Sequence, residues 1–502
     1  MRVFAKTAFR YGGVDYPYGW QDLSQALADS FKSAGLVSFT DNSADGSPVF
    51  TIAPINVPSG FRWASPPINL RRQGNSILTD FDITSIIPAI TVTYYVDPVN
   101  GLDANAGTSR GAALQNLATA LAKVDADQIR IINLTGDYIA RTTRGWNNVQ
   151  PTRSLSVIVE GGYRFISVQC ASSVAVTWSV NGTYSNVYQT TISSANSANV
   201  TDLKTSSFVQ YQDVNGLLQT APYSRLYDTY QQVSSLALVA ATPGSWFNDG
   251  TNTYVNPRDG RNLVGDTFMQ PTGSSNNGRF PSVNNLTLYV QGIDFVGGRP
   301  WYSFMLSTVT GTVAAFNNCS FQGAGGANGL NIASFQTVYC YRCFAGANYA
   351  DGFNYHSNES DGTTPNTSPS FIEIECVAYG NGTTGSAAVS DNASTCHDFA
   401  NGIRLNGIYI NSDDRVLADT NSAHTWNLGC YVGQAKQVGG GKESVSSIGT
   451  ASKMWCDSLQ VLDGANQKWI ATSGATLSAY NCGNVGNATT GEAVGTIKSY
   501  LG

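Results

Sequence analysis

The chain has 502 residues and a formal net charge of −6, and only 12% of its residues are charged. Glycine (51 residues) and tyrosine (25 residues) are abundant, which is typical of a turn-rich and β-rich protein with a polar, mostly uncharged surface, as in proteins that handle sugars. Because there is no basic run, nucleic acid is a poor candidate partner, and no window is apolar enough to span a bilayer.

The first 42 residues are predicted to form a small separate module. The stretch GWQDLSQALADSFKSAGLV places Leu23, Leu27 and Phe31 at helical spacing. The N-terminus has no apolar core of signal-peptide length. Residues 43–90 are rich in proline, glycine and serine, which predicts an extended connector with a few short strands.

From residue 91 onward the pattern predicts one long β domain. In residues 91–150 a β run leads through a Gly/Asp/Asn turn to a short amphipathic helix, expected from about Ala113 to Val124, which would cap the domain. In residues 151–502 short strands alternate with Gly, Asn, Ser and Asp turns. Residues 200–280 interrupt this pattern and are expected to form a small β insertion.

A cysteine register gives the period of this β domain. Six of the nine cysteines recur at separations of 24, 33, 54, 26 and 26 residues, namely Cys319, Cys343, Cys376, Cys430, Cys456 and Cys482. The separation of 54 is twice 27, and Ile403 fills the missing phase. A period of about 24–27 residues with three short strands predicts a parallel β-helix in which these cysteines stack inward as reduced thiols.

A family resemblance agrees with this period. The segment YYVDPVNGLDANAGTS followed by a capping helix resembles the start of right-handed β-helix domains of the pectate-lyase-like kind, and PGSWFNDGTNTYVNPRDGRNL is similar to a segment common in them. A small N-terminal module, a connector and a β-helix resemble the layout of bacteriophage tailspikes. The resemblance implies an all-β, right-handed parallel β-helix that forms a homotrimer in a virion assembled in the host cytoplasm, with residues 1–42 bound to other virion proteins.

The three histidines share one sequence pattern. Each follows an aspartate by five or six residues, in the pairs Asp351 and His356, Asp391 and His397, and Asp419 and His424. His397 precedes Ile403 by six residues and His424 precedes Cys430 by six, so these two histidines are expected to stack on adjacent coils. Asp391 and Asp419 are expected to stack nearly as well.

The same region concentrates negative charge. Residues 350–425 hold ten acids and only two bases, and stacked like charges are costly unless something offsets them. The candidate catalytic residues are Asp351, His356, Asp391, His397, Asp398, Asp419 and His424, and the candidate substrate-binding residues are Trp426, Glu375 and Arg404.

Three interpretations of this cluster remain open. In the first, a carboxylate and an imidazole act as general acid and base on a bound sugar chain, or paired carboxylates hydrolyse a glycosidic bond. In the second, imidazoles and carboxylates hold zinc or another transition ion, a metal that would be the protein's sole cofactor. In the third, the aspartates cap turns and the histidines pack between coils.

The leading hypothesis is a phage tailspike or fibre that binds a bacterial surface polysaccharide. Its candidate activity is depolymerisation, by a glycoside hydrolase or a polysaccharide lyase reaction. The alternative is a non-catalytic structural or adhesive virion fibre. A secreted polysaccharide lyase is disfavoured by the missing signal peptide.

Overall fold

The computed structural model describes most of the chain beyond residue 52 and five short strands before it. The described ranges are 2–5, 9–11, 14–16, 19–22 and 37–39, and then 53–499 except for 74–75, 142–143, 147–150, 170–175, 194–198, 214, 273–277, 281–284, 299–301, 307–310, 327, 334–336, 357–369, 383–390, 437–442, 463–466, 484–487 and 491–495. The chain forms two compact units, Met1–Pro54 with Arg71–Ser76, and Ile55–Leu70 with Ile77–Gly502.

The N-terminal part contains short antiparallel pairings. One sheet joins β4 (Gly19–Asp22), β1 (Arg2–Ala5) and β5 (Val37–Phe39), a second pairs β2 (Phe9–Tyr11) with β3 (Val14–Tyr16), and a third joins β6 (Ala53–Pro54), β7 (Leu70–Gln73) and β8 (Ser76–Thr79). The helix predicted around Leu23, Leu27 and Phe31 lies outside the described residues.

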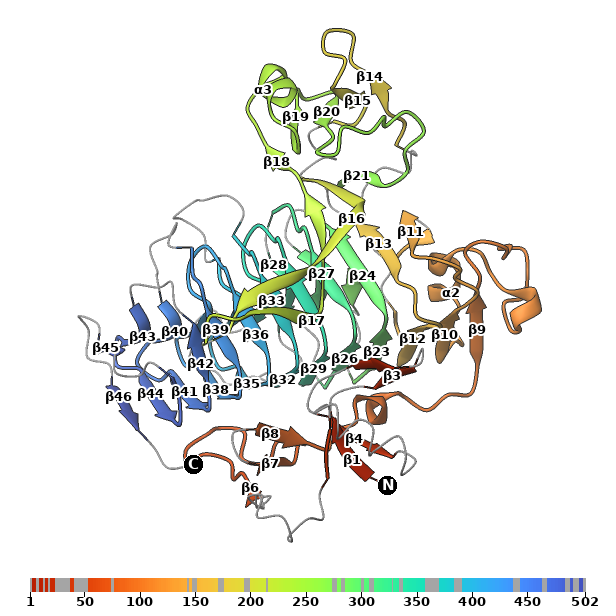
Figure 1. Ribbon diagram of the computed structural model, residues 1–502. Coiled ribbons are helices and arrows are strands. Elements are labelled where there is room, and N and C mark those ends of the chain that lie inside the picture. Colours follow the sequence, from red (N-terminus) through yellow and green to blue (C-terminus); the bar gives the residue numbers. More distant parts are fainter. Residues whose placement is uncertain are drawn as a thin grey trace. The chain divides into compact units, whose positions relative to one another are not determined.

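The second unit is built on three long parallel sheets (Figure 1). Sheet 1 comprises β9 (Thr93–Val96), β10 (Gln128–Ile131), β12 (Leu155–Val159), β23 (Thr287–Gln291), β26 (Val313–Asn317), β29 (Thr337–Tyr341), β32 (Ser370–Ile374), β35 (Asn401–Leu405), β38 (His424–Leu428), β41 (Lys453–Asp457), β44 (Thr476–Tyr480) and β46 (Thr496–Ser499). Sheet 2 comprises β11 (Tyr138–Arg141), β13 (Phe165–Gln169), β24 (Ile293–Gly297), β27 (Ser320–Gln322), β30 (Phe344–Gly346), β33 (Val377–Tyr379), β36 (Ile408–Ile410), β39 (Tyr431–Gly433) and β42 (Gln460–Leu462). Sheet 3 comprises β22 (Gly278–Phe280), β25 (Tyr302–Leu306), β28 (Asn328–Ala333), β31 (Phe353–His356), β34 (Ser394–Cys396), β37 (Leu417–Thr420), β40 (Glu443–Ile448), β43 (Gln467–Thr472) and β45 (Ala488–Thr490).

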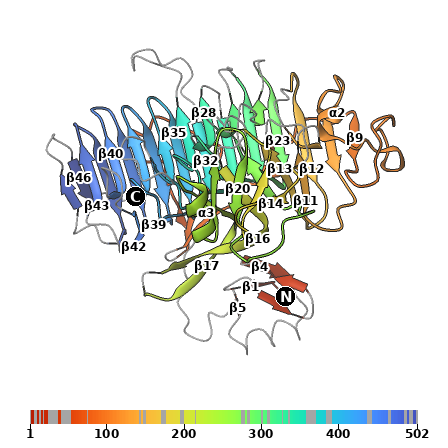
Figure 2. The same ribbon diagram turned by 90° about the horizontal axis from the view of Figure 1, so that it is seen from above.

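Each coil visits the three sheets in turn. The chain runs from β35 in sheet 1 to β36 in sheet 2 and β37 in sheet 3, and then to β38, which pairs in parallel with β35. Figure 2 shows these coils stacked along one direction. Their inward side chains form one apolar cluster from Tyr94 to Ala479. The predicted all-β parallel β-helix is therefore confirmed.

A short helix closes the N-terminal end of this core. Helix α2 (Leu117–Leu121) buries Leu117, Ala120 and Leu121 in the same apolar cluster as the first strands of sheet 1. It lies within the segment predicted as a capping helix and is shorter than expected. Two 3-10 turns, η1 (Ile83–Ile86) and η2 (Arg110–Ala112), flank the first strand of sheet 1 in the sequence.

A left-handed residue turns the chain between sheets 1 and 2 on successive coils. Asn318, Arg342, Glu375, Asn406 and Asn481 have φ between 48° and 54°. Asparagine tolerates this conformation better than most residues, which explains its recurrence. The next residue on each coil occupies the ladder position. These residues are Cys319, Cys343, Cys376, Cys430, Leu459 and Cys482, which pack in the interior cluster, and Gly407, which has no side chain.

The cysteine register therefore needs two corrections. The coil without a cysteine has Gly407 at the ladder position, and Ile403 instead joins the apolar cluster on the outer face of sheet 1. Cys456 lies on β41, where it pairs with Asn427, and Leu459 takes the ladder position. The average spacing concealed this because the coils differ in length, from 23 residues between Gly407 and Cys430 to 33 between Cys343 and Cys376.

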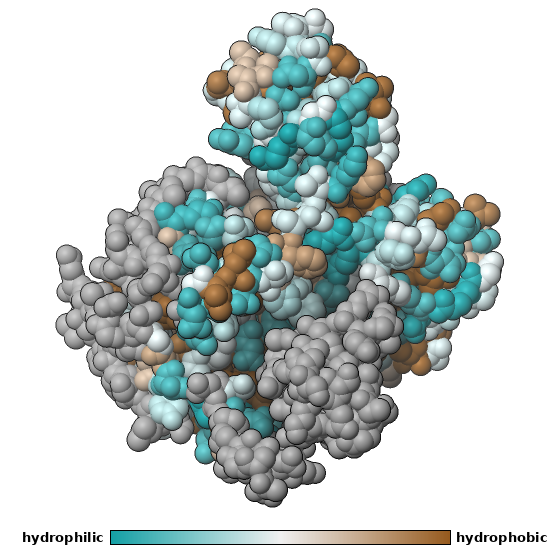
Figure 3. All heavy atoms as spheres, in the orientation of Figure 1, coloured by the Kyte–Doolittle hydropathy of each residue, from teal (hydrophilic) through white to brown (hydrophobic). Residues whose placement is uncertain are grey.

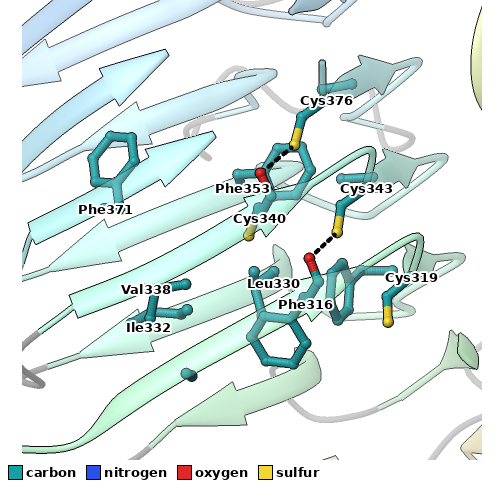
Figure 4. Packing of buried hydrophobic residues seen from close by; sticks show 14 of the residues in the cluster. Phe316, Cys319, Leu330, Ile332, Val338, Cys340, Cys343, Phe353, Phe371 and Cys376 are labelled. Carbon is teal, nitrogen blue, oxygen red and sulfur yellow. Dashed lines mark hydrogen bonds between the residues drawn. The ribbon is translucent and has the colours of Figure 1, made fainter. Parts of the chain in front are cut away.

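Backbone carbonyl groups of the preceding coil accept hydrogen bonds from the ladder thiols. The Cys343 thiol donates to Phe316 O at 3.2 Å, and the Cys376 thiol donates to Cys340 O at 3.2 Å (Figure 4). No disulfide joins the eight cysteines in the described part of the chain, and Cys170 lies outside that part.

Thiol labelling tests this interior. In the native protein a thiol-reactive dye should leave Cys319, Cys343, Cys376, Cys430 and Cys456 unmodified until the chain unfolds, because all five are buried. Burial also raises the pKa of the Cys430 thiol to about 12, which suppresses the reactive thiolate. Cys482 is partly exposed and should react first. Rapid labelling of most of the five native thiols would contradict their burial in the interior of the coils.

An insertion separates β13 of sheet 2 from β22 of sheet 3. It contains a five-stranded sheet of β14 (Ser179–Val180), β15 (Tyr188–Thr190), β20 (Thr253–Asn256), β19 (Ser245–Asn248) and β18 (Gln231–Gln232) with helix α3 (Leu236–Ala241), and a three-stranded sheet of β17 (Leu218–Thr229), β16 (Asn199–Gln212) and β21 (Met269–Thr272). In Figure 3 its surface is mostly teal and white, with brown patches along the β16–β17 hairpin, where Phe208 and Leu218 are exposed.

Candidate functional site

The outer face of sheet 1 is apolar and is covered by an earlier part of the chain. Ile403, Trp426 and Trp455 on this face belong to one buried cluster with Phe61 and Ile83 of the connector. The Phe61 ring lies edge-on to Trp426 at 6.3 Å and to Trp455 at 5.8 Å between centroids. Trp426 is 1% exposed. It therefore stabilises the packing of the connector, and it has no surface on which a sugar could stack.

His424 lies at the same covered face. Its Nδ1 accepts a hydrogen bond from the backbone N–H of Arg62 at 3.3 Å, and the Arg62 guanidinium donates to Phe399 O and Ser422 O, each at 2.7 Å. Burial, with the nearby positive charges of Arg62 and Lys453, lowers the pKa of His424 to about 3. His424 is therefore neutral near pH 7 and packs under the connector.

The outer face of sheet 2 is also apolar and covered. Side chains of β16 and β17 form a buried cluster with this face, and its members include Val209, Ala221, Phe344, Val377 and Ile410. Two of the three outer faces are thus occupied by the protein's own hydrophobic contacts.

The outer face of sheet 3 carries polar side chains. Leu330, Phe353 and Tyr355 belong to the interior cluster, so the alternation of strand side chains places Asn331 and Asn354 on the outer side. Strand pairing aligns a row of Asn331, Asn354, Thr395, Ala418 and Ser446. We call the outer side of β28, β31, β34 and β37, with the turns that flank them, the polar face.

Asp351 stands at one edge of the polar face. Its Oδ1 accepts a hydrogen bond from the backbone N–H of Asn392 at 2.7 Å, and its Oδ2 accepts one from Asn354 Nδ2 at 2.5 Å. Burial raises the pKa of Asp351 to about 7, although these hydrogen bonds and His356 favour its charged form. Asp351 therefore keeps its proton to a higher pH than an exposed aspartate does.

Asp391 lies beside this group and next to two further carboxyl groups. A Cβ on Gly382 would meet the Cβ atoms of Asp391 and Asp413 at 2.6 Å each, so both aspartates flank this glycine. Burial, and then the charges of Asp351, Asp413 and Asp414, raise the pKa of Asp391 to about 7. Two neighbouring carboxyl groups that both titrate near neutral pH form the kind of acid–base pair that glycosidic chemistry uses.

His356 and His397 form a stacked pair at the other edge. Their rings are 4.2 Å apart and 6° from parallel. Asp398 Oδ2 lies 3.7 Å from His356 Nδ1, and the Thr420 hydroxyl shares a hydrogen bond of 2.8 Å with His397 Nδ1. Burial, with the neighbouring His356, lowers the pKa of His397 to about 3. Burial thus outweighs the carboxylate for this histidine.

The structure corrects the expected stacking of the sequence pattern. His397 stacks on His356 and pairs with Thr420, whereas His424 pairs with Asn401 at the start of a sheet 1 strand. Asp391 precedes β34, but Asp419 lies within β37 and pairs with Cys396. The coil lengths differ, so equal distances from a cysteine or from Ile403 do not mean equal positions on the coil.

Asp419 and Arg404 point into the interior and have no exposed surface. Arg404 Nη1 lies 3.3 Å from Asp419 Oδ1, and Arg404 Nε donates to Ser394 Oγ at 2.8 Å. Ser394 Oγ and Tyr409 Oη donate to Glu373 at 2.9 and 2.6 Å. The two predicted site residues therefore belong to a buried polar network inside the coils and do not reach a ligand on the surface.

Glu375 occupies a left-handed corner between sheets 1 and 2, away from the polar face. Its Oε2 accepts a hydrogen bond from Arg342 Nε at 2.7 Å, and the Arg342 guanidinium lies 4.8 Å from the Tyr223 ring of β17. Of the ten predicted site residues, the polar face and its flanking turns collect Asp351, His356, Asp391, His397 and Asp398.

Sequence analysis missed several polar residues of this face. Asn354, Asn392 and Thr395 surround Asp351, and Asn392 Nδ2 donates to Thr395 Oγ1 at 3.0 Å. Asn354 Oδ1 and Asp391 Oδ1 are buried and accept no hydrogen bond. The available signal was alternation, because an asparagine stands between apolar residues in both LNIA and FNYH.

No group of three or more His, Cys, Asp or Glu residues is arranged to hold a metal ion in the ranges that the structure describes. In the same ranges no helix has the length and apolar character to cross a membrane.

This geometry makes the chain a parallel β-helix protein in which one outer face is polar, with side chains such as Asn354 (4% exposed) and Thr395 (0% exposed) buried. No protein-family profile matches the sequence, and no curated protein matches it. Among solved structures, a glycoside hydrolase aligns with 82% of this chain and 95% of its own at 10% identity and a TM-score of 0.42. Pectate lyase Pel9A aligns with 81% and 83% at 10% identity and a TM-score of 0.37, and XylC with xylose aligns with 78% and 68% at 10% identity and a TM-score of 0.35.

Proposed function

We propose that this protein binds a bacterial surface polysaccharide along the polar face of sheet 3, as a tailspike or fibre of a bacteriophage virion. The observation that carries the proposal is the contrast between the three outer faces. Two are apolar, whereas the third carries amide, hydroxyl, imidazole and carboxyl groups, most of them buried and some without a hydrogen-bond partner. Such groups recognise sugar hydroxyls through hydrogen bonds.

The virion role rests on layout. A small N-terminal module precedes a connector and a β-helix, as in the tailspikes that the sequence resembles. In this proposal residues 1–42 attach the protein to the virion, the β-helix faces the host, and three copies assemble into a homotrimer.

We include hydrolysis of the bound glycan in the proposal. Asp391, whose Oδ1 has no hydrogen-bond partner, donates its proton to the glycosidic oxygen as the bond from that oxygen to the anomeric carbon breaks. Water adds to the anomeric carbon, and its proton passes to Asp351. The products are a new reducing end and a new hydroxyl group, and the total proton count is unchanged.

One observation favours the alternative of adhesion without cleavage. Both oxygens of Asp351 already accept hydrogen bonds, from Asn392 N–H and from Asn354, as they would in a purely structural turn. The two functions differ in their products, since an adhesive fibre binds the glycan and releases no new reducing ends.

A binding experiment tests the proposal. Replacing Asn354 with alanine should weaken binding to a matching purified polysaccharide about tenfold, because it removes two hydrogen-bonding groups from the middle of the polar face. Gln210→Ala, on the exposed hairpin over sheet 2, is the matched control and should bind like the unmodified protein. Binding is measured on immobilised polysaccharides from a panel of bacterial surfaces, and reducing ends are counted in parallel. If Asn354→Ala binds the polysaccharide as tightly as Gln210→Ala does, the glycan does not bind on the polar face.

A further inference from the structure

Negative charge dominates the polar face and its flanking turns. Its acidic residues are Asp351, Asp391, Asp398, Asp413 and Asp414, and Glu443 follows at the start of β40. The permanent cations beside them in the described ranges are Arg415, Lys436 and Arg62.

Carboxylates of the protein already pair with Arg415 and Lys436, and the carbonyl groups of Phe399 and Ser422 accept hydrogen bonds from Arg62. Arg415 Nη1 lies 3.2 Å from Asp414 Oδ2, and Arg415 Nε lies 3.0 Å from Glu443 Oε2. Lys436 Nζ lies 2.9 Å from Asp413 Oδ1. An anionic sugar would have to compete with these carboxylates for a counter-ion, so the face offers a carboxylate or sulfate ligand little attraction.

The buried atoms that lack partners point to the opposite kind of ligand. Asn354 Oδ1, Asp391 Oδ1 and Asp414 Oδ1 accept no hydrogen bond, and the residues that carry them are 4%, 1% and 7% exposed. All three oxygens are acceptors when the carboxyl groups are ionised. The unpartnered hydroxyl groups of Ser412 and Ser444 take either role. Arg415 Nε also lacks a hydrogen-bond partner, but it lies 3.0 Å from the Glu443 carboxylate, so the oxygens that remain call for a ligand with hydrogen-bond donors.

We propose that the glycan bound on the polar face is uncharged or carries amino groups, and that the face discriminates against chains rich in uronate or sulfate. This inference rests on the proposed function and adds the chemical class of the ligand to it. Sugar hydroxyl groups donate to Asn354 Oδ1 and Asp391 Oδ1 without adding negative charge. An ammonium group would also neutralise part of the acidic cluster around Asp391.

The same geometry predicts how the preference can be changed. Asp391 and Asp414 contribute negative charge and an unpartnered oxygen, whereas asparagine keeps the shape and loses the charge. The double variant Asp391→Asn, Asp414→Asn should therefore bind uronate chains better than the unmodified protein does. Glu375→Gln removes the same charge at the corner where Glu375 pairs with Arg342, and it should leave the preference unchanged.

The experiment uses the full chain and three sets of purified polysaccharides at low salt. The sets are neutral (galactan, mannan, glucan, rhamnan and neutral bacterial surface chains), amino-bearing (chitosan and amino-sugar surface chains) and anionic (polygalacturonate, alginate and hyaluronate). We expect the protein to bind the neutral and amino-bearing chains at least about tenfold more tightly than the anionic chains. A difference of this size is expected when one carboxylate of the ligand is repelled by the acidic face.

Two outcomes would overturn the inference in different ways. If an anionic chain binds as tightly as any neutral one, and Asn354→Ala abolishes that binding, the preference is wrong and glycan binding on the polar face stands. If no chain of any set binds, the proposed function fails together with the inference. A gain of anionic binding in the double variant but not in Glu375→Gln supports the assignment of the preference to this face.

Discussion

Replacing Asp391 with asparagine should stabilise the folded protein at pH 8 and abolish cleavage of the glycan. Burial and three neighbouring acids raise the pKa of Asp391 to about 7, well above that of the unfolded chain. The folded state therefore binds the proton more tightly than the unfolded state, and stability is lost as the pH rises from about 4 to about 7. Asparagine has no proton to lose and avoids this penalty.

The shift of about three pKa units sets the scale of the effect. At about 1.4 kcal/mol per unit, the penalty above pH 7 reaches at most about 4 kcal/mol, and about 2 kcal/mol is expected after relaxation of the site. Thermal unfolding of both proteins at pH 4, 6 and 8 checks this. The difference in favour of Asp391→Asn should be smallest at pH 4 and largest at pH 8.

Asp398→Asn is a matched control with the opposite sign. Burial alone would raise the pKa of Asp398, but hydrogen bonding to His356 and Asn421 outweighs burial and lowers it. Its ionised form therefore stabilises the fold above the unfolded pKa, and asparagine should cost stability at pH 8. If Asp391→Asn is less stable than the unmodified protein at pH 8, the ionised form of Asp391 does not destabilise the fold, and its pKa is not raised as the site requires.

Replacing Arg404 with methionine should destabilise the fold by about 3–5 kcal/mol, because it leaves two buried carboxyl groups without their cation. Arg404 lies within the coils with Asp419 Oδ1 3.3 Å from its Nη1, and Glu373 is joined to it through Ser394. Burial raises the pKa of Asp419 to about 6 even with Arg404 present. Without the guanidinium group, these carboxyl groups must take up protons or remain charged in an apolar interior.

Urea unfolding at pH 7 measures this loss. Arg342→Met, which breaks a half-exposed pair with Glu375, should cost less than about 1 kcal/mol. Adding Asp419→Asn to Arg404→Met should recover part of the stability, since it removes one of the two buried carboxyl groups, Asp419 and Glu373, that have lost their cation. Equal losses for Arg404→Met and Arg342→Met would show that the interior network contributes no more than a surface ion pair.

The architecture could be predicted because it depends on local patterns. Short strands, turn residues and a repeat near 25 residues specify a parallel β-helix without knowledge of distant contacts. The register of individual residues could not be predicted from an average period. The segment between Cys343 and Cys376 is ten residues longer than that between Gly407 and Cys430, so a fixed offset from a cysteine shifted His424 and Cys456 to the wrong positions.

Which face of a strand becomes the site depends on contacts between distant segments. In sheet 1 both sides of β35 are buried, the inner side by the core and the outer side by the connector around Phe61. The sequence around Arg404 therefore has no alternation that distinguishes inside from outside. Trp426 was predicted to stack on a sugar for the same reason, since Phe61, which covers it, lies more than 300 positions earlier in the sequence.

The most direct test of the account is a crystal structure of the protein with an oligosaccharide from the chain that binds best. The account predicts sugar rings along the polar face, with hydroxyl or amino groups hydrogen-bonded to Asn354 Oδ1 and Asp391 Oδ1 and with a glycosidic oxygen next to Asp391. Sugar bound instead to the outer face of sheet 1 or sheet 2, or solely to the insertion, with the polar face empty, would contradict it.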